Sequence, residues 1–477
     1  MPEQFAQGFT TLKEEIACDS LPVQGSIPTW LEGSLFRTGP AQFEVGQQRY
    51  RHWFDGLAML HSFSFQAGAV SYANKFLQSP AYKAAKETGK ISFGEFATDP
   101  CRSIFQRVAS AFSSESGANA NVNISKMGEA FVALTEIPLP VEFDSRTLET
   151  VGVIHHDDGV AGQHSTAHPH YDPIRRAGIN SITQFGPKSH YNIHTIADGT
   201  TQRTLIGSIP VREPAYIHSF GMTENYIVLV EFPLVVNPLS LLTHGKPFIE
   251  NFQWKPELGT HFHVMRAVDG RVVKSYPGPT FFAFHHINAF ERGNDVVVDI
   301  VTYPNASIID NLYLDKVTTN HETALWGAFT RYILPLDGDA LIEEAITEEG
   351  IELPRINYER NNGREYQFVY SCGGDWANPN DFLNRLVKID VQAKTAQTWQ
   401  EDGCYPGEPI FVAAPQAHAE DEGVLLSVVL NSAKGNSFLL VLDATTFREL
   451  ARAEVPHHIP FSFHGMYSSL REFEGKF

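Results

Sequence analysis

Short apolar segments separated by tight polar turns recur along the chain of 477 residues. Seven of them read as a strand, a turn and a second strand, as in FSFQAGAVSYANKF and LVKIDVQAKTAQTW. Runs such as NYIVLVEF, DVVVDIVTY and GVLLSVVL lie between these hairpins and predict further, more buried strands. The pattern therefore predicts an all-β protein. The seven turns are marked by Gly68, Asp144, Asp198, Asp269, Asp337, Asp390 and Asp443.

The spacing of the turns indicates a β-propeller. Successive markers are 76, 54, 71, 68, 53 and 53 residues apart, and a four-stranded blade needs about 40 to 50 residues. Blades that carry extra loops fit these separations better than a sandwich or an α/β fold does. We therefore expect a single domain over residues 1–477 that forms a seven-bladed propeller. Because any β-rich chain of this length contains several such hairpins, the turns alone leave other β folds open.

Composition and charge exclude several classes of protein. The net charge of −19 is spread along the chain and no stripe of Lys and Arg alternates with aromatic residues, so nucleic acid is not expected as a partner. The four cysteines lie far apart without a C-x-x-C pair, which argues against a disulfide framework or a thiolate zinc site. The N-terminus lacks the pattern of a secretory signal and no apolar run could span a bilayer, so we expect a cytoplasmic protein.

Four histidines lie in apolar segments at similar distances after a turn marker. They follow it by 24, 20, 16 and 21 residues, and they are His168, His218, His285 and His464. Glu352 and Glu408 hold the corresponding place after two other markers, 15 and 18 residues on. A single histidine in such a segment is usually a satisfied core residue. Because equivalent positions of successive blades lie around the axis of a propeller, four of them predict a shared metal site.

The ligand set restricts the metal and the chemistry. Four neutral imidazoles suit iron, copper, nickel or zinc, and nearby glutamates can accept the outer ring N–H and fix each ring. Four histidines would close a tetrahedral zinc site, whereas an octahedral ferrous ion would keep two positions open. The aromatic residues around the histidines favour a dry pocket. Among the other histidines, His155, His156, His418 and His457 lie among polar or loop residues, where we expect them to be solvated.

The segment FFAFHHINAFE places two histidines next to each other. If this segment is one strand, His285 and His286 point to opposite faces. We therefore expect His285 to face the metal, and His286 to pack or to form a hydrogen bond between blades.

Motifs along nearly the whole chain resemble those of the carotenoid cleavage oxygenases. They are GSIPTWLEGSLFRTGP and YRHWFDGLAMLHSFSF, which carry Arg37 and Asp55, followed in family order by ALTEIP, TAHPHYDP, FAFHHINAFE, IELPRIN, GEPIFV and PFSFHGMY. TDPCR around Cys101, EFDSRTLETVG and FHHIN are most similar to the branch of animal β-carotene oxygenases and the retinoid isomerase. The resemblance implies a seven-bladed propeller with a four-histidine Fe(2+) centre.

The resemblance also implies roles for individual residues. His168, His218, His285 and His464 would be the iron ligands. Glu136 would orient His218, Glu352 would orient His285 and Glu408 would orient His464, which leaves His168 without a carboxylate. Thr135 is a candidate to border an open iron position through its methyl group, and an ordinary strand threonine is the alternative.

The implied reaction is cleavage of a conjugated double bond of a carotenoid or apocarotenoid by O2, which gives aldehyde or ketone products. Three alternatives stay open at this point. Two use the same scaffold, for isomerisation of a retinoid ester or for cleavage of a stilbene. The third is a propeller without catalytic activity that binds a carotenoid and holds the metal only as a structural element.

A carotenoid dissolves in membranes, so the enzyme needs an apolar surface from which to collect it. The segment FPLVVNPLSLLTHGKPF and a helical pattern over residues 99–112 are candidates to lie on a bilayer, with buried packing as the alternative for both. We expect these insertions to belong to a helical and loop cap over the face that bears the metal, and the protein to be peripherally membrane-associated. The candidate contact residues are Ile104, Phe105, Phe112, Leu239, Leu241 and Leu242.

Overall fold

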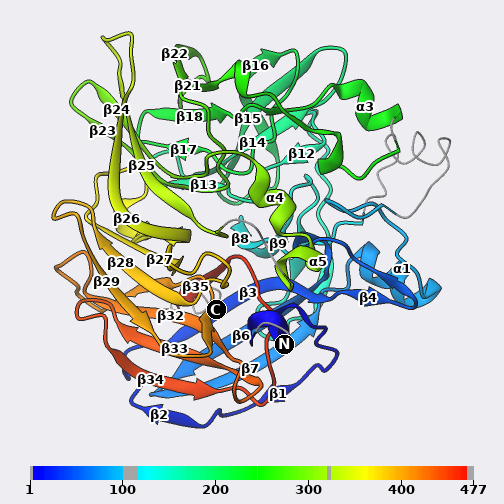
Figure 1. Cartoon of the computed structure of the whole chain (residues 1–477), viewed down its shortest axis with the longest axis vertical. Helices are drawn as coiled ribbons and strands as arrows, with labels where there is room; N and C mark the ends of the chain where they lie inside the picture. The colour runs from blue at the N-terminus through cyan, green and yellow to red at the C-terminus, as the bar shows by residue number, and fades with distance from the viewer. Residues whose placement is uncertain (1–3, 100–116, 244, 320–323, 470–477) are drawn as a thin grey trace.

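The computed structural model of the chain describes residues 4–99, 117–243, 245–319 and 324–469, without the side chain of Leu242. Strands dominate the described part, and neighbouring strands pair in the antiparallel sense. The sheets follow one another around a central region (Figure 1). The expected Cys101, Ile104, Phe105 and Phe112 contacts and the helix around them fall outside the described residues.

The strands are grouped as follows. The first two sheets contain β1 (Ala17–Cys18), β7 (Ala69–Phe76), β6 (Leu57–Gln66), β3 (Gly33–Gln42) and β35 (Gly465–Ser469), then β11 (Thr150–Val153), β10 (Val141–Phe143), β9 (Ala130–Leu134) and β8 (Asn123–Met127). The next two contain β12 (His164–Ser165), β13 (His170–Asp172), β14 (Ala177–Gln184), β15 (Ser189–Ala197) and β16 (Arg203–Val211), then β17 (Gly221–Met222), β18 (Tyr226–Glu231), β21 (Thr260–Arg266) and β22 (Val272–Gly278).

The last large sheets come from the C-terminal half. One contains β23 (His286–Arg292), β24 (Asp295–Thr302), β25 (Gly327–Pro335), β26 (Ile342–Arg355), β27 (Phe368–Gly374), β28 (Arg385–Asp390) and β29 (Thr395–Gln400). The other contains β2 (Val23–Gly25), β34 (Glu449–Glu454), β33 (Asn436–Asp443), β32 (Gly423–Asn431), β30 (Cys404–Pro406) and β31 (Ile410–Ala413). Two short pairs complete the set, β4 (Glu44–Val45) with β5 (Gln48–Arg49) and β19 (Leu234–Val235) with β20 (Gln253–Trp254).

All seven hairpins predicted from the turn markers are present. The pairs are β6 with β7, β10 with β11, β15 with β16, β21 with β22, β25 with β26, β28 with β29 and β33 with β34. The aspartates Asp144, Asp390 and Asp443 act locally, because each carboxylate accepts backbone N–H groups two or three residues further on at 2.7–2.9 Å. This side-chain turn fixes the reversal of the chain independently of the rest of the fold.

The seven-stranded sheet consists of two units that share β26. The first part of β26 pairs with β25, its second part pairs with β27, and Gly350 and Ile351 pair with both. Gly350 is required here because a Cβ at this position would lie 1.9 Å from Cδ1 of Trp326. The junction places Glu352 just beyond the point at which the strand changes partners.

The two ends of the chain complete sheets that begin far away in the sequence. The N-terminal β2 pairs with β34, and the C-terminal β35 pairs with β3. Because β35 pairs at Gly465, the residue after His464, this closure holds that histidine in the central region.

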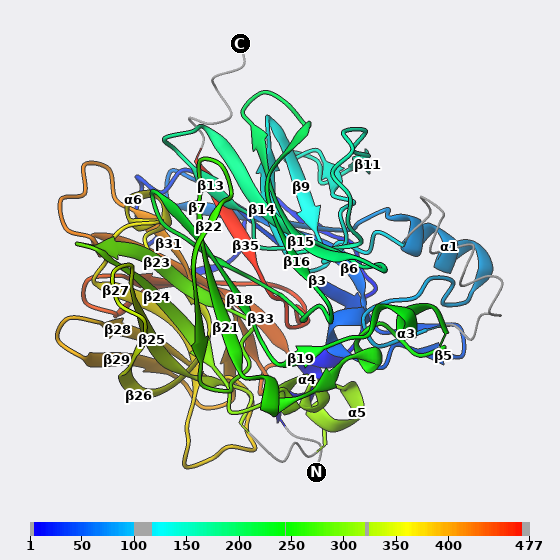
Figure 2. The ribbon, with the colours of Figure 1, turned by 90° about the horizontal axis from the view of Figure 1, so that it is seen from above.

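Helices are short and lie outside the sheets. They are α1 (Pro80–Thr88), α3 (Pro238–Thr243), α4 (Ser307–Asn311), α5 (Leu314–Val317) and α6 (Tyr358–Asn361), with the 3-10 segments η1 (Gln4–Phe9), η2 (Trp53–Asp55), η3 (Ile249–Asn251) and η4 (Pro256–Leu258). Figure 2 shows α3, α4 and α5 on the same side of the sheets. None of the described helices is both long and apolar enough to cross a membrane. The largest buried cluster is rich in aromatic residues and includes Phe281, Phe282 and Phe284 from the segment before β23.

Candidate metal centre

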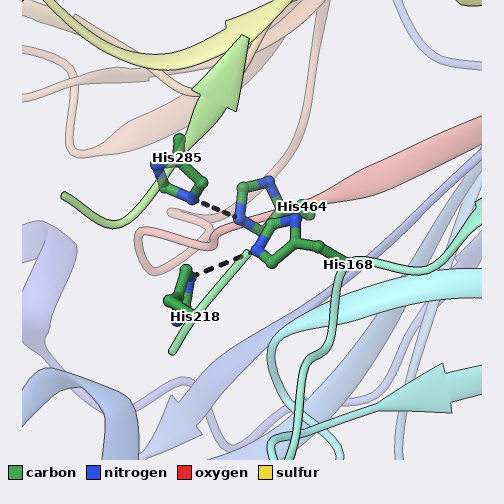
Figure 3. A group of neighbouring side chains, drawn as sticks. All are labelled: His168, His218, His285 and His464. Carbon is green, nitrogen blue, oxygen red and sulfur yellow. Dashed lines mark hydrogen bonds between the residues drawn. The ribbon is translucent and has the colours of Figure 1, made fainter. Parts of the chain in front are cut away.

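The four predicted histidines each stand in a short loop just before a strand at the edge of a sheet. His285 and His464 directly precede β23 and β35, while His168 and His218 lie two and three residues before β13 and β17. A side chain at such a position is held in place by the strand that follows it. The fold thus aims four imidazoles from four different sheets at one point (Figure 3).

The inner nitrogen atoms of these imidazoles converge. Nε2 of His168 lies 3.1 Å from Nε2 of His218, and Nε2 of His285 lies 3.1 Å from Nε2 of His464 (Figure 3). One ring nitrogen from each of the four residues lies within 4.8 Å of all the others. A metal bonds imidazole nitrogen at about 2.0–2.1 Å, so two ligands at a right angle would be about 3.0 Å apart. The observed spacing therefore matches four ligands of one ion.

Three glutamates contact the outer nitrogens. Nδ1 of His218 donates to Glu136 Oε1 at 2.6 Å, and Nδ1 of His285 donates to Glu352 Oε2 at 2.5 Å. Nδ1 of His464 donates to Glu408 Oε1 at 2.7 Å. The ring of His168 contacts no carboxylate in the described part of the chain.

These hydrogen bonds settle which ring nitrogen carries the proton, and so provide a test of whether the residues fit a metal. A neutral imidazole that donates through Nδ1 has a lone pair on Nε2. Nε2 of His285 and Nε2 of His464 therefore face each other as two acceptors, an arrangement that a cation between them would stabilise. Burial, together with the positive charges of its neighbours, lowers the pKa of His464 well below its ordinary value, which keeps the ring neutral. The donor set fits a divalent transition metal.

Two of the supporting carboxylates are ionised. Burial alone would raise the pKa of Glu136 and of Glu352, but the neighbouring His218 and His285 outweigh it and the pKa of each carboxyl group is lowered. Each negative charge therefore lies one imidazole away from the place where the four nitrogens converge.

Further residues hold the glutamates, and among them only Arg37 was singled out from the sequence. Tyr216 OH donates to Glu136 Oε1 at 2.7 Å, and Tyr303 OH donates to Glu352 Oε1 at 2.8 Å. Arg355 donates from Nε to Glu408 Oε1 at 2.7 Å, and Arg37 lies 3.5 Å from Oε2 of the same group. Their positions offered a signal, because Tyr216 is two residues before His218 and Arg355 lies three residues after Glu352 in IELPRIN.

A cavity leads to this centre. Its wall includes His218, His285, His464 and their partners Glu136 and Glu352, but His168 is not part of the wall. Thr135 lies one residue after β9 and lines the cavity next to Glu136. The rest of the lining is mostly apolar and includes Phe54, Phe96, Phe284, Leu312, Leu353 and Phe463.

Asp55 fixes part of the cavity wall. Its carboxylate accepts the backbone N–H of Ala97 at 3.0 Å and the hydroxyl of Thr98 at 2.6 Å, and it lies in η2 beside Phe54. These bonds bring Phe96 against Phe54, with the ring centres 5.1 Å apart. Burial raises the pKa of Asp55 to about 6.

The histidine doublet differs from the expectation of one continuous strand. Only an isolated bridge at Phe282 precedes His285, and β23 begins at His286. The side chains of His285 and His286 nevertheless have different surroundings, because only His285 belongs to the group of four imidazoles. Nδ1 of His286 lies 2.8 Å from Oγ of Ser219, and its Nε2 has no partner among the described residues.

Two of the four histidines expected in solvent are not solvated. His155 and His418 are exposed, but the side chain of His156 is only 3% exposed and its Nδ1 lies 3.0 Å from the carbonyl of Thr201. His457 is half-buried, because its segment packs between the first and last sheets and its ring lies 5.7 Å from that of Tyr72. Local polarity did not reveal this packing.

Known proteins are similar to this chain in sequence and in fold. A sequence model described as retinal pigment epithelial membrane protein matches residues 9–469. The mitochondrial carotenoid-cleaving dioxygenase of Macaca fascicularis is 36% identical over 96% of this chain and 93% of the relative. The β,β-carotene 15,15′-dioxygenase of Gallus gallus is 36% identical over 93% of this chain and 94% of the relative. The solved structure of a cobalt-substituted apocarotenoid oxygenase from Synechocystis has a TM-score of 0.87 at 26% identity and covers 98% of both chains. The chain therefore belongs to the retinal pigment epithelial membrane protein family of carotenoid oxygenases.

Proposed function

We propose that this protein is a non-heme Fe(2+) dioxygenase that cleaves a conjugated double bond of a carotenoid or apocarotenoid into two carbonyl products. The observation that carries the proposal is the group of four converging imidazoles, three of which are buried and line an aromatic cavity. Relatives that are 36% identical are named as carotenoid-cleaving and β-carotene dioxygenases. Bound ferrous iron would supply the activation of O2.

His168, His218, His285 and His464 are the proposed ligands of the iron. Glu136, Glu352 and Glu408 orient three of these rings and offset the charge of the ion. Thr135 lines the cavity beside Glu136, where its methyl group would limit access to one open position of the metal. Ferrous iron is preferred to zinc because zinc with four histidines leaves no position for substrate or O2.

The cavity supports a long apolar substrate. Phe54 makes edge-to-face contacts with Phe284 and Phe463, at 5.8 and 5.0 Å between ring centres, so the aromatic wall is rigid next to the histidines. Such faces pack against a planar polyene, exclude water and can stabilise positive charge that develops along it. No pair of general acid and base is needed for this chemistry.

We also propose that the sheets form the seven blades of a propeller in one domain, residues 1–477. The two four-stranded units that share β26 count as two blades, and β2 and β35 close the ring. The segment with α3, α4 and α5 would form a cap, since Ile308 in α4 and the adjacent Leu312 line the cavity.

Contact with a membrane surface is part of the proposal. Leu239 in α3 is 65% exposed, whereas Leu241 is half-buried against the main core. The segment after α3 reaches the cavity wall, because the N–H of Ile249 donates to the carbonyl of Phe96 at 3.0 Å. An apolar substrate that leaves a bilayer near Leu239 would therefore have a short path to the cavity.

Product identification tests the function. Purified protein with Fe(2+) is incubated with a panel of carotenoids, apocarotenals, stilbenes and retinyl esters under ¹⁸O₂, and the products are analysed by mass spectrometry. We expect labelled aldehydes or ketones from a carotenoid or apocarotenoid, and none without O2 or in His285→Ala. Unlabelled isomerised retinoid would point to an isomerase, and labelled phenolic aldehydes would point to a stilbene oxygenase. Bound iron without any product would favour a carotenoid-binding protein with a structural metal.

A further inference from the structure

The three glutamates behind the histidines are not held in the same way. Glu136 and Glu352 each accept a neutral tyrosine hydroxyl in addition to their histidine. Glu408 instead lies between two guanidinium groups, those of Arg37 and Arg355. The negative charge behind His464 is therefore compensated, while the charges behind the other two histidines are not.

The contacts of Arg355 are specific. Its Nε donates to Glu408 Oε1 at 2.7 Å, the same oxygen that accepts Nδ1–H of His464 at 2.7 Å. Its Nη2 donates to the carbonyl of Gly465, the residue after this histidine, also at 2.7 Å. The side chain is 27% exposed. Arg355 thus shares one carboxylate oxygen with a proposed metal ligand and contacts that ligand's backbone.

Arg37 makes a different set of contacts. It is almost fully buried, and Nη1 donates to the carbonyl of Glu408 at 3.2 Å while Nη2 donates to the carbonyl of Phe463 at 2.8 Å. Its distance to the carboxylate, 3.5 Å, is longer than that of Arg355. Arg37 therefore mainly fixes the backbone on both sides, and Arg355 is the arginine that draws charge from the Glu408 carboxylate.

We propose that Arg355 is a positioning residue that acts through Glu408 and makes His464 a weaker electron donor than His218 or His285. The inference rests on the proposed metal site. A carboxylate strengthens the imidazole that it supports, and a guanidinium on the same oxygen opposes this. Three carboxylates and two arginines give the centre by itself a charge of −1, which a divalent ion changes to +1. Removal of the Arg355 charge would leave the loaded centre neutral, so the metal should bind more tightly.

The direction of the change in metal affinity distinguishes this charge effect from a merely structural role of Arg355. Arg355→Gln keeps a hydrogen-bond donor but removes the positive charge. Arg355→Lys keeps the positive charge but loses the planar guanidinium with its several N–H donors. Arg292→Gln is the matched control. Arg292 pairs with the exposed Glu365 at 2.6 Å, and it lies seven residues after His285, about 20 Å along β23. Co(2+) affinity is measured anaerobically by competition with a chelator, and folding of each metal-free variant is checked by thermal unfolding.

We expect Arg355→Gln to bind Co(2+) about tenfold more tightly than the unmodified protein. Arg355→Lys and Arg292→Gln should stay within about twofold of it. Weaker or equal binding by a folded Arg355→Gln variant would overturn the proposal, because a structural arginine can only be lost at a cost. If Arg355→Gln does not fold, the Lys variant decides, since a tenfold loss of affinity there would show that geometry and not charge matters.

Loss of the positive charge should also favour the ferric state. In air, the Fe(2+) bound to Arg355→Gln should be oxidised to Fe(3+) several-fold faster than the Fe(2+) bound to the unmodified protein. The Fe(2+) bound to Arg355→Lys should be oxidised at the rate of the unmodified protein. Equal rates for both variants would contradict the charge effect. The proposed function fails separately, if the unmodified protein binds metal but releases no carbonyl product. If the unmodified protein binds no metal, both the proposed function and the proposed role of Arg355 are wrong.

Discussion

Replacement of Glu352 by Gln isolates the charge behind a proposed ligand. Oε2 of Glu352 accepts Nδ1–H of His285 and the backbone N–H of Leu353, each at 2.5 Å, and Oε1 accepts the hydroxyl of Tyr303 at 2.8 Å. A glutamine has the same shape, and its amide oxygen can keep the first two bonds. Its NH₂ group would then donate to Tyr303, whose hydroxyl can accept as well as donate. The variant should therefore fold and keep the ring of His285 in place.

The expected loss is one of metal affinity. A hydrogen bond to a charged acceptor contributes about 1.5–3 kcal/mol, against about 0.5–1.5 kcal/mol for a neutral acceptor. The Glu352 side chain is only 7% exposed, so solvent screens this difference little. Loss of a partner behind a metal ligand commonly lowers affinity about 10- to 100-fold, which equals about 1.4–2.7 kcal/mol. The difference between the charged and the neutral bond, about 1–1.5 kcal/mol, lies at the lower end of this range, so we expect about a tenfold loss of affinity for Glu352→Gln.

The assay compares bound Co(2+) or Fe(2+) in chelator competition with the unfolding of the metal-free protein. Glu344→Gln is the matched control, because it lies on the same strand β26 and forms a surface ion pair with Lys394 at 2.5 Å. This control should bind metal normally. Unchanged affinity in Glu352→Gln, or an equal loss in Glu344→Gln, would refute the assignment of Glu352 as the support of His285.

Three further predictions use other parts of the molecule. His285→Ala should lose metal and activity while His286→Ala keeps its metal, because the second ring contacts Ser219, and equal loss in both would contradict this geometry. Burial lowers the pKa of His194 to about 3, so this residue favours folding above its unfolded pKa of about 6.5, and that contribution is lost as the pH falls towards 3. His194→Gln should make the fall in unfolding free energy between pH 6 and 4 less steep by up to about 1.4 kcal/mol per pH unit, and parallel slopes in denaturant titrations would count against it. Leu239→Ser with Phe112→Ser should lower liposome co-sedimentation several-fold and leave bound iron unchanged, whereas undiminished sedimentation would rule out docking through these residues.

The hairpins were readable from the sequence because their cause is local. An aspartate such as Asp390 accepts N–H groups of its own turn, and the apolar segments on both sides alternate with the period of a strand. The four histidines were also found from the sequence, by their similar distances after the turn markers, and each stands shortly before an edge strand. Order and spacing were thus enough to place the proposed ligands.

The tertiary structure decided what surrounds the histidines. Arg37, Arg355 and Glu408 meet only because the C-terminal strand β35 pairs with β3, which brings together residues hundreds of positions apart. The start of β23 at His286 likewise depends on pairing with β24, not on the phenylalanines before it. Local composition predicts where the chain turns and which apolar segments form strands. Which carboxylate supports which imidazole, and with how much compensating charge, depends on how the sheets close around one centre.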